Sequence, residues 1–142
     1  MASARPPATD WTQRKAPSLE EFEALADAAF RRLPERFLRF CEDLVLCVED
    51  FPDDDVLEEF DAESEFDLLG LFRGHGMAQQ SEGAQTGQLP NMIYLYRRPI
   101  LDVWTEGDET LGDLIRHVLV HEIGHHFGLS DEDMDRIEGE AE

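Results

Sequence analysis

The sequence contains few basic residues for its length. Its 142 residues include 12 lysines and arginines against 33 aspartates and glutamates, which gives a formal net charge of -21 at pH 7. A surface of this sign repels the phosphates of nucleic acids and the headgroups of anionic membranes. We therefore expect neither nucleic acid nor membrane as a partner, whereas neutral or basic molecules are compatible with the charge. The charge favours solubility and says little about the fold.

Long apolar runs and cysteines are also scarce. No run approaches the ~20 residues that span a bilayer, and the first 17 residues hold no apolar stretch of the kind that a secretory signal needs. The cysteines are Cys41 and Cys47, six residues apart. An extended segment of that length separates its ends by about 20 Å, too far for a disulfide. We therefore expect free thiols in a cytoplasmic protein.

The remaining composition is that of a globular protein, with 42% hydrophobic residues. A chain of this length forms one domain with a substantial core. Residues 1–17 contain Pro6, Pro7 and Pro17 and few apolar side chains, which predicts a disordered N-terminal arm. Residues 18–142 then make up the single domain.

Local signals predict helices and strands in the first half of the chain. Residues 18–21, SLEE, form the S-x-x-E pattern of a capping box, and apolar residues then recur at helical spacing. Pro34 ends or kinks this helix, and a second short helix fits residues 34–40. Apolar runs typical of strands follow at residues 44–48 and 68–72.

Two less regular segments separate these runs from the next strand. Asp54 or Asp55 is predicted to cap a short helix that extends to Phe60. Residues 77–90 are polar and show no periodicity, which predicts a loop of a length that often has a function. The clearest strand comes next, at residues 91–96.

The second half of the chain contains the longest helical pattern. A short helix is first predicted over residues 99–104, with a proline suited to its first turn. A long apolar helix then begins after Asp108 or Thr110 and extends to about Phe127. Gly128 follows in the position where glycine commonly ends a helix. The acidic residues 131–142 can form a short final helix.

The most informative stretch is HEIGHHFGLSD, which falls at the end of this long helix. His121 and His125 are four residues apart, so both side chains lie on one face with Cβ atoms ~6 Å apart. Two imidazoles in this arrangement can bind one zinc ion, each at ~2.0 to 2.1 Å. Glu122 lies beside them and can reach a zinc-activated water without binding the metal. This is the H-E-x-x-H arrangement of two ligands and a general base.

The residues that follow suggest a third ligand. Gly128 can adopt a left-handed conformation and reverse the chain, and Asp131 can then bring a carboxylate to the metal. The pattern His-x3-His-x5-Asp supplies three protein ligands and leaves a fourth position for water. Such an open position is typical of catalytic zinc, whereas structural zinc has four protein ligands.

HEIGHHFGLSD resembles the extended motif H-E-x-x-H-x-x-G-x-x-H/D of metzincin-type metallopeptidases. With LLGLFRG at residues 68–74 and IYLYRRPILDVW at residues 93–104, the chain resembles the bacterial mini-zincins, a family of zincin-like metallopeptidases, over roughly residues 18–135. The resemblance implies an α+β fold in which a small twisted sheet packs against a long active-site helix. It also implies one Zn2+ per chain, bound by three ligands and served by one catalytic acid/base. The ligands would be His121, His125 and Asp131, and the acid/base would be Glu122.

The function expected on these grounds is that of a zinc-dependent metallopeptidase acting on a peptide or protein substrate, for which the charge favours a basic one. Two alternatives stay open: zinc stabilises a non-catalytic binding module, or the site hydrolyses a non-peptide substrate. Bacterial RNA-processing proteins with a H-x3-H-x5-H site share the ligand spacing, but they lack the glutamate after the first histidine. RNA binding also needs a basic surface. The sequence makes no prediction about oligomeric state.

Three neighbours of the motif have less specific interpretations. His126 points ~100° away from His125 around the helix, which predicts a surface position or one next to the ligands, rather than a ligand. His117 is one turn before His121, and we expect a partly buried neutral histidine rather than one hydrogen-bonded near the site. Gly124 lowers helix stability by about 1 kcal/mol relative to alanine, so a close approach of a strand, a substrate or another helix is expected there.

A hydrolytic zinc site also needs a donor for the oxyanion that develops during the reaction. The candidates are Tyr94, Tyr96, Arg97 and His75. A peptide substrate could lie along an exposed edge strand, for which we expect residues 92–96, by adding a strand to the sheet.

Overall fold

The structure is a computed structural model that describes residues 10–74 and 90–140. Within these ranges, six α-helices and three strands make up an α+β fold, as expected, and two short 3-10 helices lie at Trp11–Gln13 and Arg39–Cys41. In chain order the elements are α1 (Leu19–Arg31), α2 (Glu35–Leu38), β1 (Val45–Glu49), α3 (Asp54–Glu59), β2 (Gly70–Arg73), β3 (Met92–Tyr96), α5 (Arg97–Glu106), α6 (Leu111–His126) and α7 (Asp131–Glu140).

The sheet is small and mixed, with the strand order β1-β3-β2. β1 runs parallel to β3, with Val45 opposite Met92, and β2 runs antiparallel to it, with Gly70 opposite Leu95. The expectation that residues 92–96 form an edge strand is therefore wrong. A strand order depends on contacts between distant segments, and the local pattern of β3 carries no information about them.

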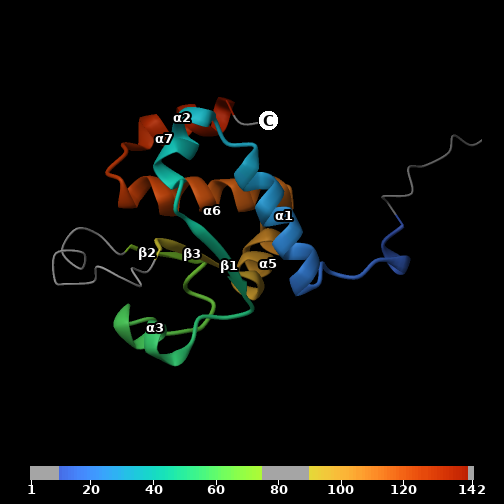
Figure 1. Ribbon diagram of the computed structural model, residues 1–142. Coiled ribbons are helices and arrows are strands. Elements are labelled where there is room, and N and C mark those ends of the chain that lie inside the picture. The colour runs from blue at the N-terminus through green and yellow to red at the C-terminus, as the bar shows by residue number, and fades with distance from the viewer. Residues whose placement is uncertain (1–9, 75–89, 141–142) are drawn as a thin grey trace, which may run out of the picture.

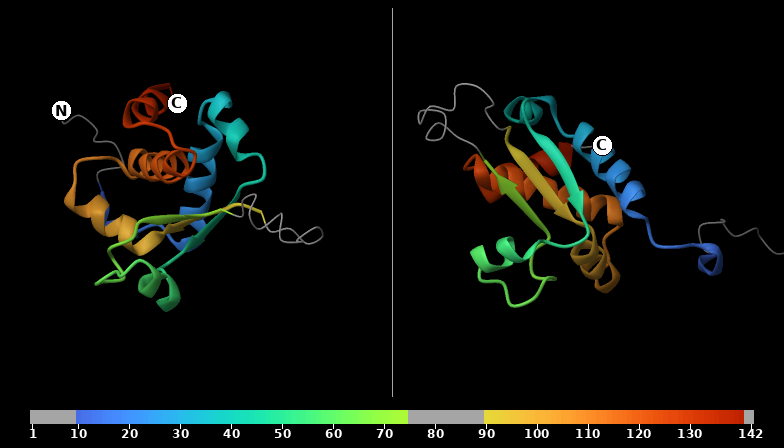
Figure 2. Two further views of the ribbon diagram at one scale, coloured as in Figure 1. Left: turned by 90° about the vertical axis from the view of Figure 1, so that its left-hand side faces the viewer. Right: turned by 60° about the horizontal axis from the view of Figure 1, so that its bottom comes forward.

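Helix α6 lies in the middle of the molecule (Figures 1 and 2). The sheet lies on one side of it and α1 packs against its flank and against β1, whereas α7 lies on the side away from the sheet. Helix α3 is on the opposite side of the sheet from α6. A helix with neighbours on several sides has a wide apolar surface. Consistent with this, Val118, Leu119 and Val120 are all buried, although they point in three directions around the helix.

The core lies between α6, α1 and the sheet. Ile115, Leu119 and Ile123 follow one another at four-residue spacing on α6 and are fully buried. Burying each large apolar side chain contributes about 1.5–3 kcal/mol. The same core cluster includes Phe22 and Ala26 of α1 and Ile93 and Leu95 of β3. The core thus fixes α6, the helix that carries the H-E-x-x-H residues, against the sheet.

Most helix ends agree with the expected caps. The capping box is formed, since Ser18 Oγ accepts from the Glu21 amide at 3.1 Å and Glu21 Oε1 accepts from the Ser18 amide at 2.8 Å. Thr110 Oγ1 accepts from the Asp113 amide at 3.1 Å and begins α6. Gly107 ends α5.

Helix α3 departs from the expected cap, because Asp53 rather than Asp54 or Asp55 caps it. Asp53 Oδ1 accepts from the Val56 amide at 2.9 Å. Asp54 and Asp55 occupy the first turn instead, where their charge is favourable near the positive end of the helix.

The structure also bears on the expected thiols, on the expected loop and arm, and on membrane-spanning helices. Cys41 and Cys47 are free thiols, as expected. Residues 77–89 of the expected loop and residues 1–9 of the expected disordered arm lie outside the described residues. Among the described helices, none has the length and apolar character needed to cross a bilayer.

Candidate metal centre

The end of α6 and the start of α7 form a tight reversal that positions the expected site. Gly128 has a positive φ of 75°, in the left-handed region that glycine enters without strain. Its amide donates to the carbonyl of His125 at 3.1 Å, and the Leu129 amide donates to the carbonyl of Gly124 at 2.9 Å. This pair of hydrogen bonds is the Schellman motif. It satisfies the last carbonyls of α6 and starts α7 at Asp131, as the sequence predicts for the turn.

The three expected ligands come together at this reversal. His121 and His125 lie one turn apart on α6, with ring centroids 5.7 Å apart and planes at 83°. One ligand atom from each of His121, His125 and Asp131 lies within 4.8 Å of the other two. His125 and Asp131 are exposed and His121 is half-buried. The group is therefore partly open to solvent.

The donor set and one unsatisfied atom fit a zinc ion. Nε2 of His121 is buried and makes no hydrogen bond within the described residues, although it lies 3.2 Å from Oε2 of Glu138. A buried polar atom without a hydrogen bond is costly, and coordination to a metal removes that cost. Two imidazoles and one carboxylate are a common ligand set for zinc. The residues present therefore fit the metal that the motif implies.

Glu122 faces the sheet rather than α7. A Cβ atom added to Gly70 of β2 would lie 3.3 Å from Glu122 Cγ and 3.0 Å from the carbonyl oxygen of Tyr94. Gly70 thus allows α6 to approach β2 closely at the level of Glu122. Burial raises the pKa of Glu122, an effect partly opposed by His125. A carboxylate with a raised pKa accepts a proton more readily, which suits a general base.

Gly70 is a residue that the sequence analysis missed. A glycine inside an apolar strand pattern often marks a close approach of another backbone or helix, and LLGLF contains that signal. The partner of the close approach cannot be read from the pattern, because it lies 52 residues further along the chain, at Glu122.

Gly124 allows the close packing of α7 against α6. A Cβ atom added there would lie 2.5 Å from Sδ and 2.9 Å from Cγ of Met134. Met134 is fully buried, and Ile137 on the same face of α7 is 5% exposed. Of the interpretations given for Gly124, helix packing is therefore confirmed. The contact also holds α7, and with it Asp131, in place beside the two histidines.

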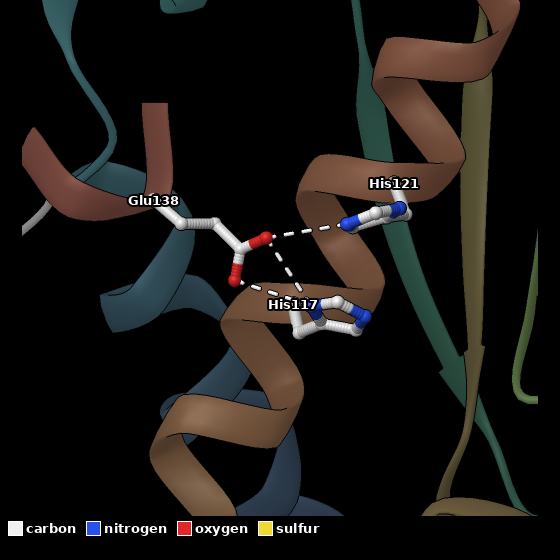
Figure 3. Close-up of side chains that lie close together, drawn as sticks. All are labelled: His117, His121 and Glu138. Atoms are coloured by element: carbon white, nitrogen blue, oxygen red, sulfur yellow. Dashed lines mark hydrogen bonds and ion pairs between the residues drawn. The ribbon is translucent and has the colours of Figure 1, made fainter. Parts of the chain in front are cut away.

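The other two histidines of α6 have different surroundings. His126 is exposed, as expected, and its ring stacks on Phe72 with centroids 3.9 Å apart and planes at 20°. His117 is not partly buried as expected. It is exposed, and Nδ1 lies 3.2 Å from both carboxylate oxygens of Glu138 on α7 (Figure 3). The expectation failed because the partner belongs to another helix.

The candidate oxyanion donors are mostly engaged elsewhere. Arg97 donates from Nε to the carbonyl of Pro17 at 2.8 Å and from Nη1 to Asp50 at 3.0 Å. Tyr96 is 1% exposed, and burial raises the pKa of its phenol. Tyr94 is half-buried and its hydroxyl lies 3.7 Å from Sδ of Met92. The fourth candidate, His75, lies outside the described residues.

Comparisons with known proteins concern the fold and the family of this chain. A conserved hypothetical protein from Thermo thermophilus has a similar structure, with a TM-score of 0.53, 23% sequence identity and coverage of 78% of this chain and 94% of that one. At this identity the likeness concerns the fold alone. No curated protein gives a significant match. The model of the Zincin-like metallopeptidase family matches residues 41–141, a span that includes the sheet, α6 and α7. The chain therefore belongs to the zincin-like metallopeptidase family.

Proposed function

We propose that this protein is a zinc-dependent peptidase with His121, His125 and Asp131 as ligands and Glu122 as general base. The observation that carries the proposal is the grouping of the three ligand atoms within 4.8 Å of one another. Glu122, which follows the first ligand in the sequence, points toward the sheet. The base is thus adjacent to the ligand His121 along α6 but does not compete with the ligands for the same position. Family membership supports the hydrolase class.

The metal and the side chains would supply different parts of the chemistry. Zinc, when bound, supplies a Lewis acid that polarises the scissile carbonyl and makes water acidic enough to lose a proton near neutral pH. Glu122 accepts that proton from the attacking water and then donates it to the leaving amine. Its burial against β2 supports both steps, because a raised pKa keeps the proton on the carboxylate between them. The histidine and aspartate ligands hold the reacting groups beside Glu122.

The strand β2 is the best candidate to align a peptide. It is an edge strand among the described residues, since β3 occupies only one of its sides. It also packs on α6 beside Glu122 through Gly70. A peptide that adds to the free side of β2 would form main-chain hydrogen bonds and pass close to the base. The net charge of -21 favours a basic peptide.

A matched pair of variants tests this function. Glu122→Gln keeps the shape of the side chain but cannot accept a proton, so turnover of basic peptides should fall by about 10²–10⁴-fold. Zinc content, measured by elemental analysis, should stay at that of the wild-type protein. Glu132→Gln, an exposed change on α7, is the control and should leave both unchanged.

Two results would contradict the proposal. Full peptidase activity in Glu122→Gln would exclude its role as the base. Zinc binding without hydrolysis of any member of a peptide library would favour the alternatives, a zinc-stabilised binding module or a hydrolase of another substrate. Assays with ester and amide small molecules distinguish these two alternatives. A hydrolase of another substrate should cleave some of them in a reaction that depends on Glu122, whereas a binding module should cleave none.

A further inference from the structure

A second group of potential metal ligands lies one turn before the first along α6. Glu138 points from α7 toward the face of α6 that carries His117 and His121 (Figure 3). Both oxygens of Glu138 lie 3.2 Å from Nδ1 of His117, and Oε2 lies 3.2 Å from Nε2 of His121. One ligand atom from each of the three residues lies within 4.8 Å of the other two.

We propose that His117, His121 and Glu138 form a second position for a divalent transition metal, which competes with the first position for His121. The two imidazoles and one carboxylate repeat the donor chemistry of the first group, so both select zinc and similar ions. Because His121 belongs to both groups, occupation of one position removes a ligand from the other. The chain then holds one ion at a time, at either of two positions.

The surroundings of the second group favour an ion more than a simple surface ion pair would. The side chains of Glu138 and His121 are only 17% and 23% exposed, so their interaction with a cation is less weakened by water than at an exposed site. Nε2 of His121 has no hydrogen bond within the described residues despite its short distance to Glu138. The rings of His117 and His121 are also close, with centroids 4.0 Å apart.

The packing of α7 preorganises this group. Met134 fills the space above Gly124, and Ile137, next to Glu138 in the sequence, is buried against the core. Glu138 is therefore held facing α6 by apolar contacts that need no metal. A preorganised carboxylate loses little conformational freedom when an ion binds.

The inference rests on the proposed function only through the shared ligand His121. Metal-binding experiments on the full chain test the second position and the proposed catalytic site separately. The probe is Co2+, titrated into metal-free protein and followed by calorimetry and visible absorption, with Zn2+ competition as a second readout. His125→Ala disables the first position and should still bind about one Co2+ with two imidazole ligands. Adding Glu138→Gln to it should weaken that binding by a factor on the order of 100. Adding Asp135→Asn, an exposed α7 carboxylate outside both groups, should not.

The converse variant tests the first position by itself. His117→Ala combined with Glu138→Gln disables the second position and should bind one Co2+ at the first. Failure of this variant alone would overturn the proposed catalytic site and leave the second position standing. A folded His125→Ala protein, checked by circular dichroism, that binds no Co2+ would overturn the second position. Two ions bound by the wild-type protein would overturn the competition for His121.

Discussion

The two sides of α6 differ in their packing partners and in the chemistry of their side chains. The side toward the sheet and α1 is apolar, apart from Glu122 and His126, and its residues Ile115, Leu119 and Ile123 are fully buried. The side toward α7 carries His117 and His121 and meets Glu138. Both sides contribute packing, but the large core residues of α6 lie toward the sheet and α1, and the metal ligands lie toward α7. A rigid core on one face of a helix therefore allows polar side chains without a full set of hydrogen bonds to persist on the other face.

Truncating one residue on each side should give the largest difference in stability. Leu119→Ala removes a fully buried side chain and should lower the free energy of unfolding of the metal-free protein by about 2–5 kcal/mol. His125→Ala changes an exposed residue and should lower it by less than about 0.5 kcal/mol. Urea denaturation measures both, and equal losses would contradict the division of roles.

The contact between Gly124 and Met134 joins α6 to α7, so a change there should have the next largest effect on stability. In Gly124→Ala the new methyl group would lie 2.5 Å from Sδ of Met134, and the overpacking should cost about 1–3 kcal/mol. It should also weaken Zn2+ binding, because α7 and Asp131 must move away from α6. Unchanged stability and unchanged zinc affinity, measured by denaturation and calorimetry, would show that α7 does not depend on this contact.

The turn after α6 should be less sensitive. Gly128→Ala places a Cβ atom on a residue with φ 75° and should cost about 1–2 kcal/mol. Gly112→Ala is the matched control, since it lies in the first turn of the same helix with nothing within 4 Å of the added atom. Thermal denaturation of both variants should show a loss only for Gly128→Ala. A similar loss in both would contradict the role assigned to the left-handed turn.

The smallest effect concerns Glu122, the carboxylate on the sheet side. Burial raises the pKa of Glu122 in the folded protein above its ordinary value of 4.5. The protonated form is therefore favoured by folding, and this contribution is present below pH 4.5 and is lost as the pH rises through the folded pKa. Glu122→Gln cannot ionise, so the metal-free variant should be more stable than the wild-type protein at neutral pH. Denaturation at a series of pH values should show the difference shrinking as the pH falls, and a constant difference would contradict the shift.

Much of α6 and its site could be predicted from the sequence because the signals are local. The Thr110 cap, the four-residue spacing of His121 and His125, and the glycine at position 128 each depend on neighbouring residues only. The resemblance to zincin-like metallopeptidases rests mainly on the same short segment, with weaker support from residues 68–74 and 93–104. The grouping of the three expected ligands could be predicted because it depends only on the end of α6 and the turn that follows it.

Features that depend on distant segments could not be predicted. The central position of β3 comes from pairing with two separate strands. Gly70 contacts Glu122 and Glu138 contacts His117 across different elements. No spacing rule within one element reports such contacts, which is why the edge strand and the surroundings of His117 were wrongly predicted.

Elemental analysis tests most directly whether this chain binds zinc through the histidines of α6. The protein should be purified without chelators or added metal, beside a His121→Ala variant whose fold is checked by circular dichroism. We expect about one zinc ion per wild-type chain and none in the variant, because His121 is part of both ligand groups. Absence of metal from the wild-type protein, or equal zinc in the two proteins, would contradict it.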